Sequence, residues 1–215
     1  MKHLVFALLA AALLSAAAVA AEDAAQQQHR ITLFNDADFT GWKLFLPDKG
    51  ADPFNTWSVR DGVIRCTGSP AGYLRTTETY SDYTLSFEWR WPAGGGNSGV
   101  LIHVQDKDEV WPKSIEGQLQ SGHAGDIWII GGTTFTEHVN KDDRRVVKGE
   151  ASSEKPLGEW NQYKVVCKGD TIELYINGTL QNRATGCTVT SGFIGLQSEG
   201  TPIEFRNIHI EPMGK

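Results

Sequence analysis

Apolar and polar side chains alternate with a period of two along much of this chain. The clearest example is the segment 83–91, in which five aromatic or aliphatic side chains share one face and polar side chains occupy the other. Two further β runs meet at Asp61-Gly62, and another pair meets at Asn177-Gly178, which are strong hairpin turn signals. No segment shows a convincing helical period. The pattern therefore predicts an all-β domain built as a sandwich of two sheets.

The segment 97–120 carries the most informative of these alternations. Ile115, Gly117 and Leu119 point to one side of the predicted strand, whereas Glu116 and Gln118 point to the other. A strand with one apolar face packs on a core, and its second face is usually solvated. A carboxylate between hydrogen-bonding side chains is also what an acid–base site requires, so both interpretations stay open at this point.

The N-terminal segment has the features of a secretory signal. Lys2 is followed by an apolar run that ends in Ala18-Val19-Ala20, and a polar stretch follows it. We expect a signal peptide at 1–20, a polar leader at 21–29 and a single β-sandwich domain at 30–215, with a periplasmic or secreted mature protein. A membrane anchor is the alternative for the apolar run, but its small-residue end favours cleavage. No stable membrane anchor is expected in the mature chain.

The composition of the chain limits the classes of molecule that it is expected to bind. The net charge is −6 and the chain has no Lys/Arg cluster, which argues against nucleic acid as a partner. The three cysteines, Cys66, Cys167 and Cys187, match no zinc or redox spacing and allow at most one disulfide. The chain has seven tryptophans, and Trp111 in a polar loop beside Pro112 is the best candidate for an exposed ring that stacks on a sugar.

Nine short motifs occur along the mature chain in a familiar order. They are Trp57-Ser58-Val59-Arg60-Asp61-Gly62-Val63, Gly72-Tyr73-Leu74-Arg75-Thr76, Glu88-Trp89-Arg90, Asn97-Ser98-Gly99-Val100, Ile115-Glu116-Gly117-Gln118-Leu119, Gly158-Glu159-Trp160-Asn161, Ile176-Asn177-Gly178, Ile194-Gly195-Leu196-Gln197-Ser198-Glu199-Gly200 and Phe205-Arg206-Asn207-Ile208. With these motifs the chain resembles the 3-keto-disaccharide hydrolase domain family over essentially its whole mature length. The resemblance implies a concanavalin-like jelly roll of two antiparallel sheets. It also implies a small carbohydrate substrate whose C3 hydroxyl a separate glycoside 3-dehydrogenase has already oxidised to a ketone.

The chemistry of a 3-keto-glycoside suggests roles for the polar residues. A ketone at C3 acidifies the C2 proton, so a base can remove it, and β-elimination then expels the anomeric oxygen before water adds. Glu116 is the first candidate for the base, and His103 is a second acid–base candidate. Glu199, which shares its strand face with Gln197, is the candidate proton donor to the leaving group. Gln118 and Gln197 are predicted to bind substrate.

Further substrate-binding candidates come from other segments. Arg75 and Arg90 are candidates to polarise the ketone, although Arg90 also fits a same-face ion pair with Glu88 of its own strand. Asp126 and His123 follow the Glu116 strand and are placed at the rim of the site, and Trp111 is the candidate stacking ring.

Three alternatives remain. His103, Glu116 and either Glu199 or Asp126 would suit a divalent metal ion, but no local spacing supports one, so no metal ligand is assigned. A non-catalytic carbohydrate-binding module is the first rival function. A hydrolase of unoxidised glycosides is the second, although the strand of Glu116 lacks the paired carboxylates of laminarinases and only Glu199 offers a partner.

Overall fold

The computed structural model describes residues 30–214, so the predicted signal peptide and polar leader lie outside the described residues. The elements are β1 (Ile31–Thr32), β2 (Trp42–Phe45), a 3₁₀ turn η1 (Pro53–Asn55), β3 (Trp57–Arg60), β4 (Val63–Cys66), β5 (Gly72–Thr76), β6 (Tyr83–Arg90), β7 (Gly99–Val104), β8 (Ser114–Gln118), β9 (Ile127–Ile130), β10 (Arg145–Val146), β11 (Asn161–Lys168), β12 (Thr171–Ile176), β13 (Thr179–Ala184), β14 (Phe193–Ser198) and β15 (Ile203–Pro212).

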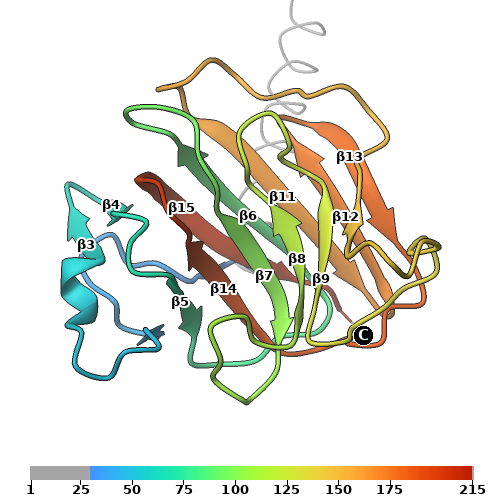
Figure 1. The fold of residues 1–215 in the computed structure, drawn as a ribbon, viewed down its shortest axis with the longest axis horizontal. Coiled ribbons are helices and arrows are strands. Elements are labelled where there is room, and N and C mark those ends of the chain that lie inside the picture. Colours follow the sequence, from blue (N-terminus) through green and yellow to red (C-terminus); the bar gives the residue numbers. More distant parts are fainter. Residues whose placement is uncertain (1–29, 215) are drawn as a thin grey trace, which may run out of the picture. The chain divides into compact units, whose positions relative to one another are not determined.

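Two antiparallel sheets overlie each other (Figure 1). One sheet has the strand order β13-β12-β11-β6-β15-β4-β3, and we call it the β6 sheet. The other has the order β10-β9-β8-β7-β14-β5-β2, and we call it the β8 sheet. In both sheets, pairs of consecutive strands are combined with pairs that are far apart in sequence, as in a jelly roll, and the predicted two-sheet, all-β architecture is confirmed.

The turns follow the sequence signals. Asp61 and Gly62 join β3 to β4, and Asn177 and Gly178 join β12 to β13. All four residues have positive φ values of 53°, 72°, 49° and 85° respectively. Two successive positive φ values characterise the tight turn whose twist matches that of paired strands, which explains why Asp-Gly and Asn-Gly stand at these positions.

The core lies between the sheets. In β6 every second side chain from Tyr83 to Trp89 is buried, and the intervening ones are partly exposed. Gly117 of β8 faces the same core, because a Cβ at this position would lie 2.5 Å from the hydroxyl oxygen of Tyr163 in β11. Since side chains alternate along a strand, Glu116 and Gln118 project to the outer face of the β8 sheet. All three cysteines are buried free thiols.

The outer face of the β8 sheet carries a second, smaller apolar cluster. Tyr73, Leu101, Val104 and Ile130 are buried there, and Trp111 packs against them with Phe45 and Phe193. Trp111 belongs to the loop between β7 and β8, which Gln105 N–H and the Lys113 carbonyl close with a 3.0 Å hydrogen bond. This loop, residues 105–113, covers part of the sheet, so the outer face is only partly open to solvent.

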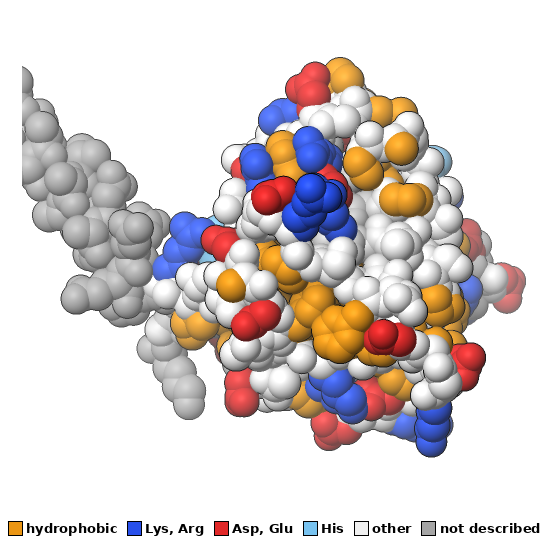
Figure 2. Space-filling view, turned by 90° about the vertical axis from the view of Figure 1, so that its left-hand side faces the viewer, with side chains coloured by type: hydrophobic (Ala, Val, Ile, Leu, Met, Phe, Trp, Pro, Cys, Tyr) orange, Lys and Arg blue, Asp and Glu red, His pale blue; other side chains and the backbone are white. Residues whose placement is uncertain are grey.

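The face that carries β3 and β4 has charges of both signs (Figure 2). Figure 2 views the molecule from the side that carries β3 and β4, and acidic and basic side chains are interspersed there with hydrophobic ones. A face of mixed sign lacks the continuous basic field that binding to a phosphate backbone requires. Within residues 30–214, no helix has the length and apolar character needed to cross a membrane.

Candidate active site

A pocket of about 170 Å³ lies on the outer face of the β8 sheet. Five adjacent strands contribute to it, either directly or through the segments at their ends: β10, β9, β8, β7 and β14. The side chains that line it are Asn97, Trp111, Glu116, Gln118, Trp128, Ile130, Arg144, Gln197 and Glu199. The structure thus brings together five of the residues that the sequence suggested, namely Glu116, Gln118, Gln197, Glu199 and Trp111.

The floor of the pocket is formed where β7 has no side chain. Gly99 lies opposite Gln118, and β7 separates the strand of Glu116 from the strand of Gln197. A Cβ at residue 99 would lie 2.1 Å from Oε1 of Glu116 and 2.8 Å from Oε1 of Gln197. Glu116 and Gln197 therefore reach across Gly99 from both sides, and only glycine leaves them this space.

Glu116 is a buried carboxyl group in a polar pocket. Its side chain is 6% exposed and its Oε1 atom has no hydrogen-bond partner within the described residues. The pKa of Glu116 is raised from 4.5 to about 8, chiefly by burial and secondly by the negative charge of Glu199. A hydrogen bond from the Gln197 side chain and the charge of Arg144 act in the opposite direction. A carboxylate with such a pKa is a much stronger base than an exposed one.

Glu199 supplies a second carboxyl group. It follows β14 directly and forms an isolated bridge with Asn97, which precedes β7. Partial burial raises the pKa of Glu199, and a hydrogen bond from the Asn97 side chain lowers it in part. Two carboxyl groups whose charges interact and which face one pocket allow one to act as a base while the other holds a proton.

Arg144 and two tryptophans complete the pocket wall. Trp111 comes from the β7–β8 loop and Trp128 from β9, and both rings are half-buried. The guanidinium of Arg144 lies 5.7 Å from the centre of the Trp128 ring, and its charge acts on Glu116. A cation and two aromatic walls around carboxylates suit an uncharged polar ring such as a sugar.

The β7–β8 loop is fastened to the sheet by Asp108. The Tyr73 hydroxyl donates a 2.9 Å hydrogen bond to Asp108, and Lys43 and Arg75 form ion pairs with it. The guanidinium of Arg75 also stacks on the Phe193 ring at 3.7 Å. Arg75 is therefore part of the loop anchor and does not line the pocket, although it was a candidate to polarise the substrate ketone.

His103 lies in the interior between the sheets, away from the pocket-lining residues. It is fully buried, its Nδ1 lies 3.2 Å from the carbonyl oxygen of Val189, and its ring packs edge-on against Tyr83. Burial lowers the pKa of His103, which favours the neutral imidazole. The reason for this placement is a φ of 55° at His103, which interrupts the alternation that would have put it beside Glu116.

Arg90 lies in the other sheet. Its Nε atom forms a 2.6 Å ion pair with Glu204, and its guanidinium stacks on Trp160. Arg206 lies over the same ring and pairs with Glu88. Arg90 thus belongs to an ion pair and not to the pocket, but the predicted partner was wrong: Arg90 pairs with Glu204 on the neighbouring strand β15 and not with Glu88 of its own strand.

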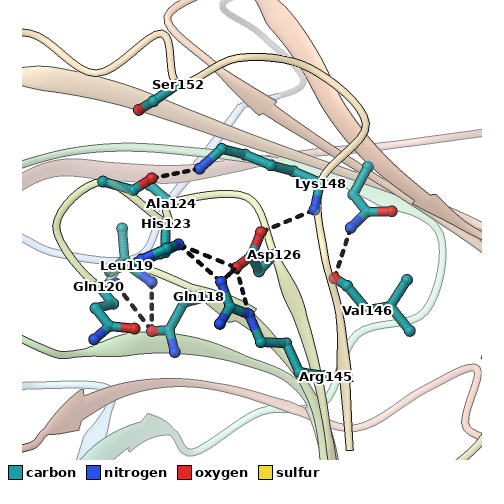
Figure 3. Close-up of polar contacts among 12 residues, drawn as sticks. Gln118, Leu119, Gln120, His123, Ala124, Asp126, Arg145, Val146, Lys148 and Ser152 are labelled. Atoms are coloured by element: carbon teal, nitrogen blue, oxygen red, sulfur yellow. Dashed lines mark hydrogen bonds and ion pairs between the residues drawn. The ribbon is translucent and has the colours of Figure 1, made fainter. Parts of the chain in front are cut away.

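Asp126 and His123 form a structural cluster beside the pocket. Asp126 is fully buried and accepts hydrogen bonds from Nε of Arg145 at 2.7 Å and from the Lys148 backbone at 2.8 Å, while Arg145 also contacts His123 (Figure 3). Figure 3 also shows the side-chain oxygen Oε1 of Gln118 accepting hydrogen bonds from the backbone N–H groups of Leu119 and Gln120, which leaves the side-chain NH₂ group of Gln118 for the pocket. Asp126 thus anchors the segment 133–157, which carries Arg145. It does not lie at the rim of the pocket, which is the position predicted for it.

Four pocket residues were absent from the sequence-based set: Asn97, Trp128, Ile130 and Arg144. Trp128 and Ile130 are alternate residues of the run 127–130, so they face the same side of a β-strand. This alternation is the sequence signal that could have identified them. Arg144 lies in the aperiodic segment 133–157, where nothing in the sequence distinguishes it from its charged neighbours.

The comparisons with known proteins concern the family and the fold. Residues 29–211 match the family described as the 3-keto-alpha-glucoside-1,2-lyase-like domain. The chain belongs to this family. A 3-keto-disaccharide hydrolase of Bacteroides thetaiotaomicron is 24% identical over 230 residues, which cover 84% of this chain and 77% of that protein. The family predicted from the nine motifs is confirmed.

Solved structures support the fold of this family member. A Parabacteroides distasonis protein assigned as a glycosyl hydrolase matches with a TM-score of 0.66 and 24% identity, covering 87% of this chain and 95% of that one. A carbohydrate-binding module of Bacillus subtilis matches with a TM-score of 0.58 and 16% identity, covering 78% and 93%. At these identities the likeness concerns the fold alone, and the same jelly roll serves proteins of both kinds.

Proposed function

We propose that the chain cleaves glycosides whose C3 hydroxyl has been oxidised to a ketone, and that the pocket around Glu116 performs the reaction. Family membership supports a glycoside-cleaving enzyme. The observation that carries the finer proposal is a single buried carboxyl group, Glu116, with a pKa of about 8, an unpartnered oxygen and a cation beside it. This arrangement suits removal of a carbon-bound proton.

The reaction begins at C2. The C2–H bond breaks, Glu116 accepts the proton, and the electron pair forms an enolate whose charge lies on the C3 oxygen. Arg144 is the available cation in the pocket for this oxygen, and preorganised donors of this kind contribute about 10²–10³-fold in rate. A base contributes about 10²–10⁴-fold.

The enolate then breaks the anomeric bond. Its electrons form a C1–C2 double bond, the C1–O bond breaks, and the leaving oxygen takes a proton from Glu199, the second carboxyl group of the pocket, whose pKa is raised by burial. Addition of water, with oxygen to C1 and hydrogen to C2, yields the free 3-keto sugar. The words 1,2-lyase in the family description fit the first, eliminating half of this sequence.

Matched substrates test the proposal. The purified chain is offered a glucoside and its 3-keto counterpart, and sugar release is followed for both. Only the 3-keto glycoside should be cleaved, because only its C2 proton is acidic. Cleavage of both at similar rates would instead favour ordinary hydrolysis by Glu116 and Glu199. Binding of either sugar without turnover, with and without added divalent ions, would favour a binding module.

A pair of variants tests the base. Glu116→Gln keeps the shape of the side chain and removes the proton acceptor, so turnover should fall about 10²–10⁴-fold and exchange of the C2 proton with deuterated water should stop. Glu211→Gln removes the same charge from β15, outside the pocket, and should leave both rates unchanged. Exchange in Glu116→Gln within a factor of about three of wild type would contradict the role of Glu116.

Export and the upstream partner belong to the same proposal. The sequence signal at 1–20 supports delivery to the periplasm or medium, and mass spectrometry of exported protein should find a chain that starts near Ala21. A membrane-bound species that retains residues 1–20 would contradict this. The substrate requires a separate dehydrogenase that oxidises the C3 hydroxyl, since the proposed steps do not form the ketone.

A further inference from the structure

The cation of the pocket, Arg144, lies on a segment that has few contacts of its own. Its side chain is exposed, and its guanidinium lies 5.7 Å from the ring centre of Trp128 in β9. Its backbone carbonyl accepts a 2.9 Å hydrogen bond from Ile129 N–H. β10 then adds two residues of pairing with β9, at the edge of the β8 sheet. A short edge segment of this kind opens easily unless side chains fasten it.

The neighbouring residue, Arg145, supplies the missing attachment. Its Nε atom donates a 2.7 Å hydrogen bond to Oδ2 of Asp126, and a second guanidinium nitrogen lies 2.5 Å from the same oxygen (Figure 3). That second nitrogen also donates to Nδ1 of His123 at 2.8 Å. A planar guanidinium with several charge-assisted contacts has little freedom to move. Because Arg144 is bonded directly to Arg145, fixing one limits the positions open to the other.

Asp126 is itself fixed on several sides. Its side chain is fully buried, and Oδ1 accepts a 2.8 Å hydrogen bond from the backbone N–H of Lys148, which follows β10. Its backbone carbonyl accepts a 2.9 Å hydrogen bond from the N–H of Gln118, a pocket residue of β8. One buried carboxylate therefore joins the strand of Glu116 and Gln118 to the chain on both sides of Arg145.

The position of Arg144 matters for the proposed base. Burial and the charge of Glu199 raise the pKa of Glu116, and the charge of Arg144 opposes them. The interaction between two charges weakens with distance, so a displaced Arg144 would act less on Glu116. In the proposed reaction the same displacement would remove the cation from the enolate oxygen.

We propose that Asp126 is a positioning residue of this site, which holds Arg144 at the pocket through its ion pair with Arg145. Asp126 does not line the pocket among the described residues, so it would act on the reaction through Arg144. The positioning is a property of the free protein, whereas its effect on turnover rests on the proposed function.

Titration of Glu116 tests the positioning without substrate. ¹³C NMR follows the side-chain carboxyl group, and Glu116→Gln identifies its signal. Asp126→Asn keeps the shape of the side chain and an oxygen for Lys148, but it presents an NH₂ group to Arg145. Arg144 is then released, and the pKa of Glu116 should rise. Loss of a nearby negative charge would by itself lower that pKa, so the sign of the change separates positioning from a direct charge effect.

A double-mutant cycle shows whether Asp126 acts through Arg144. Arg144→Met should raise the pKa of Glu116, and Asp126→Asn should raise it no further in the Arg144→Met background. Turnover of a 3-keto glycoside should follow the same pattern. The kcat of Asp126→Asn should fall about 10- to 100-fold, with a smaller change in KM, because misplacing a catalytic group by about 1 Å costs up to about 10²-fold. In the Arg144→Met background the same substitution should leave kcat unchanged.

Two further variants make the test specific. Arg145→Lys keeps the charge but replaces the planar fork by one ammonium group, so the same changes should appear with smaller size. Glu154→Gln removes a carboxylate that fastens the same segment elsewhere, where it accepts hydrogen bonds from the N–H groups of Gly122 and Ala124. It should leave the titration and kcat as in wild type. Circular dichroism confirms that each variant is folded.

The outcomes distinguish this inference from the proposed function. An unchanged Glu116 titration in both Asp126→Asn and Arg145→Lys would overturn the positioning role, as would an equal effect of Asp126→Asn with and without Arg144. A raised pKa of Glu116 in Asp126→Asn, with no turnover of 3-keto glycosides by wild type, would keep the positioning role and overturn the proposed function. Turnover by wild type, with the titration and kcat unchanged in Asp126→Asn, would do the reverse.

Discussion

Glu116 should make the protein less stable at alkaline pH, and its replacement by glutamine should remove this effect. The carboxyl group has a pKa of 4.5 in the unfolded chain and about 8 in the folded one. Below pH 4.5 it is protonated in both states and has no effect on the free energy of unfolding. Between pH 4.5 and 8 the unfolded chain releases the proton while the folded chain retains it, so stability falls as pH rises. Above pH 8 the loss is complete.

The magnitude follows from the two pKa values. One pKa unit corresponds to about 1.4 kcal/mol, so the difference between 4.5 and about 8 amounts to about 5 kcal/mol. Glu116→Gln lacks the titrating group and should therefore gain several kcal/mol relative to wild type between pH 5 and 9. For a domain of this size each kcal/mol shifts the melting temperature by about 2–4 °C, so the effect is easily measured.

The assay is urea unfolding of both proteins across this pH range. Glu173→Gln provides a control whose stability difference from wild type should not change between pH 5 and 9, since a hydrogen bond from Tyr175 and then the charge of Arg183 lower the pKa of Glu173 below its ordinary value. The stability that Glu173 contributes is present above its unfolded pKa and is lost as pH falls through its folded pKa. A difference between Glu116→Gln and wild type that does not change with pH would refute the reasoning.

Three further results should follow from the site. The value of kcat/KM should rise with pH toward a plateau above about 8, because Glu116 must be ionised to accept a proton; a rate independent of pH from 6 to 9 would contradict this. Gly99→Ala should lower turnover about 10²-fold while far-ultraviolet circular dichroism stays unchanged, because its Cβ would displace Glu116; full activity would show that the floor is not tight. Asp108→Asn should raise KM up to about fivefold with little change in kcat, because it weakens the anchor of the loop that carries Trp111; an equal fall in kcat at unchanged KM would contradict a positioning role.

The sequence predicted the sheets and one wall of the pocket well. A period of two is a direct consequence of extended backbone, so parity alone placed Glu116 and Gln118 on the face opposite Gly117. The same argument placed Gln197 with Glu199. The hairpins could be located because Asp-Gly and Asn-Gly have a strong local preference for their turns.

The rest depended on contacts that local patterns do not encode. His103 has a left-handed backbone conformation, and one such residue shifts every later side chain to the other face. Arg75 lies in the sheet of the site, but Asp108 from a distant loop holds it. Arg90 belongs to the other sheet, which only the strand order reveals. Arg144 comes from a segment without periodicity.

The adjacent residues Arg144 and Arg145 are held in the structure in different ways. Arg145 is bound to the buried Asp126, so its loss would disturb the attachment of the whole segment. Arg144 projects into the pocket from an edge segment whose strand, β10, pairs only with β9 in the described sheet. The two carboxyl groups thus lie on or next to strands inside the β8 sheet, whereas the cation lies next to the edge strand β10. A change in this edge segment can therefore replace the positive charge of the pocket without moving the strands that carry the carboxyl groups.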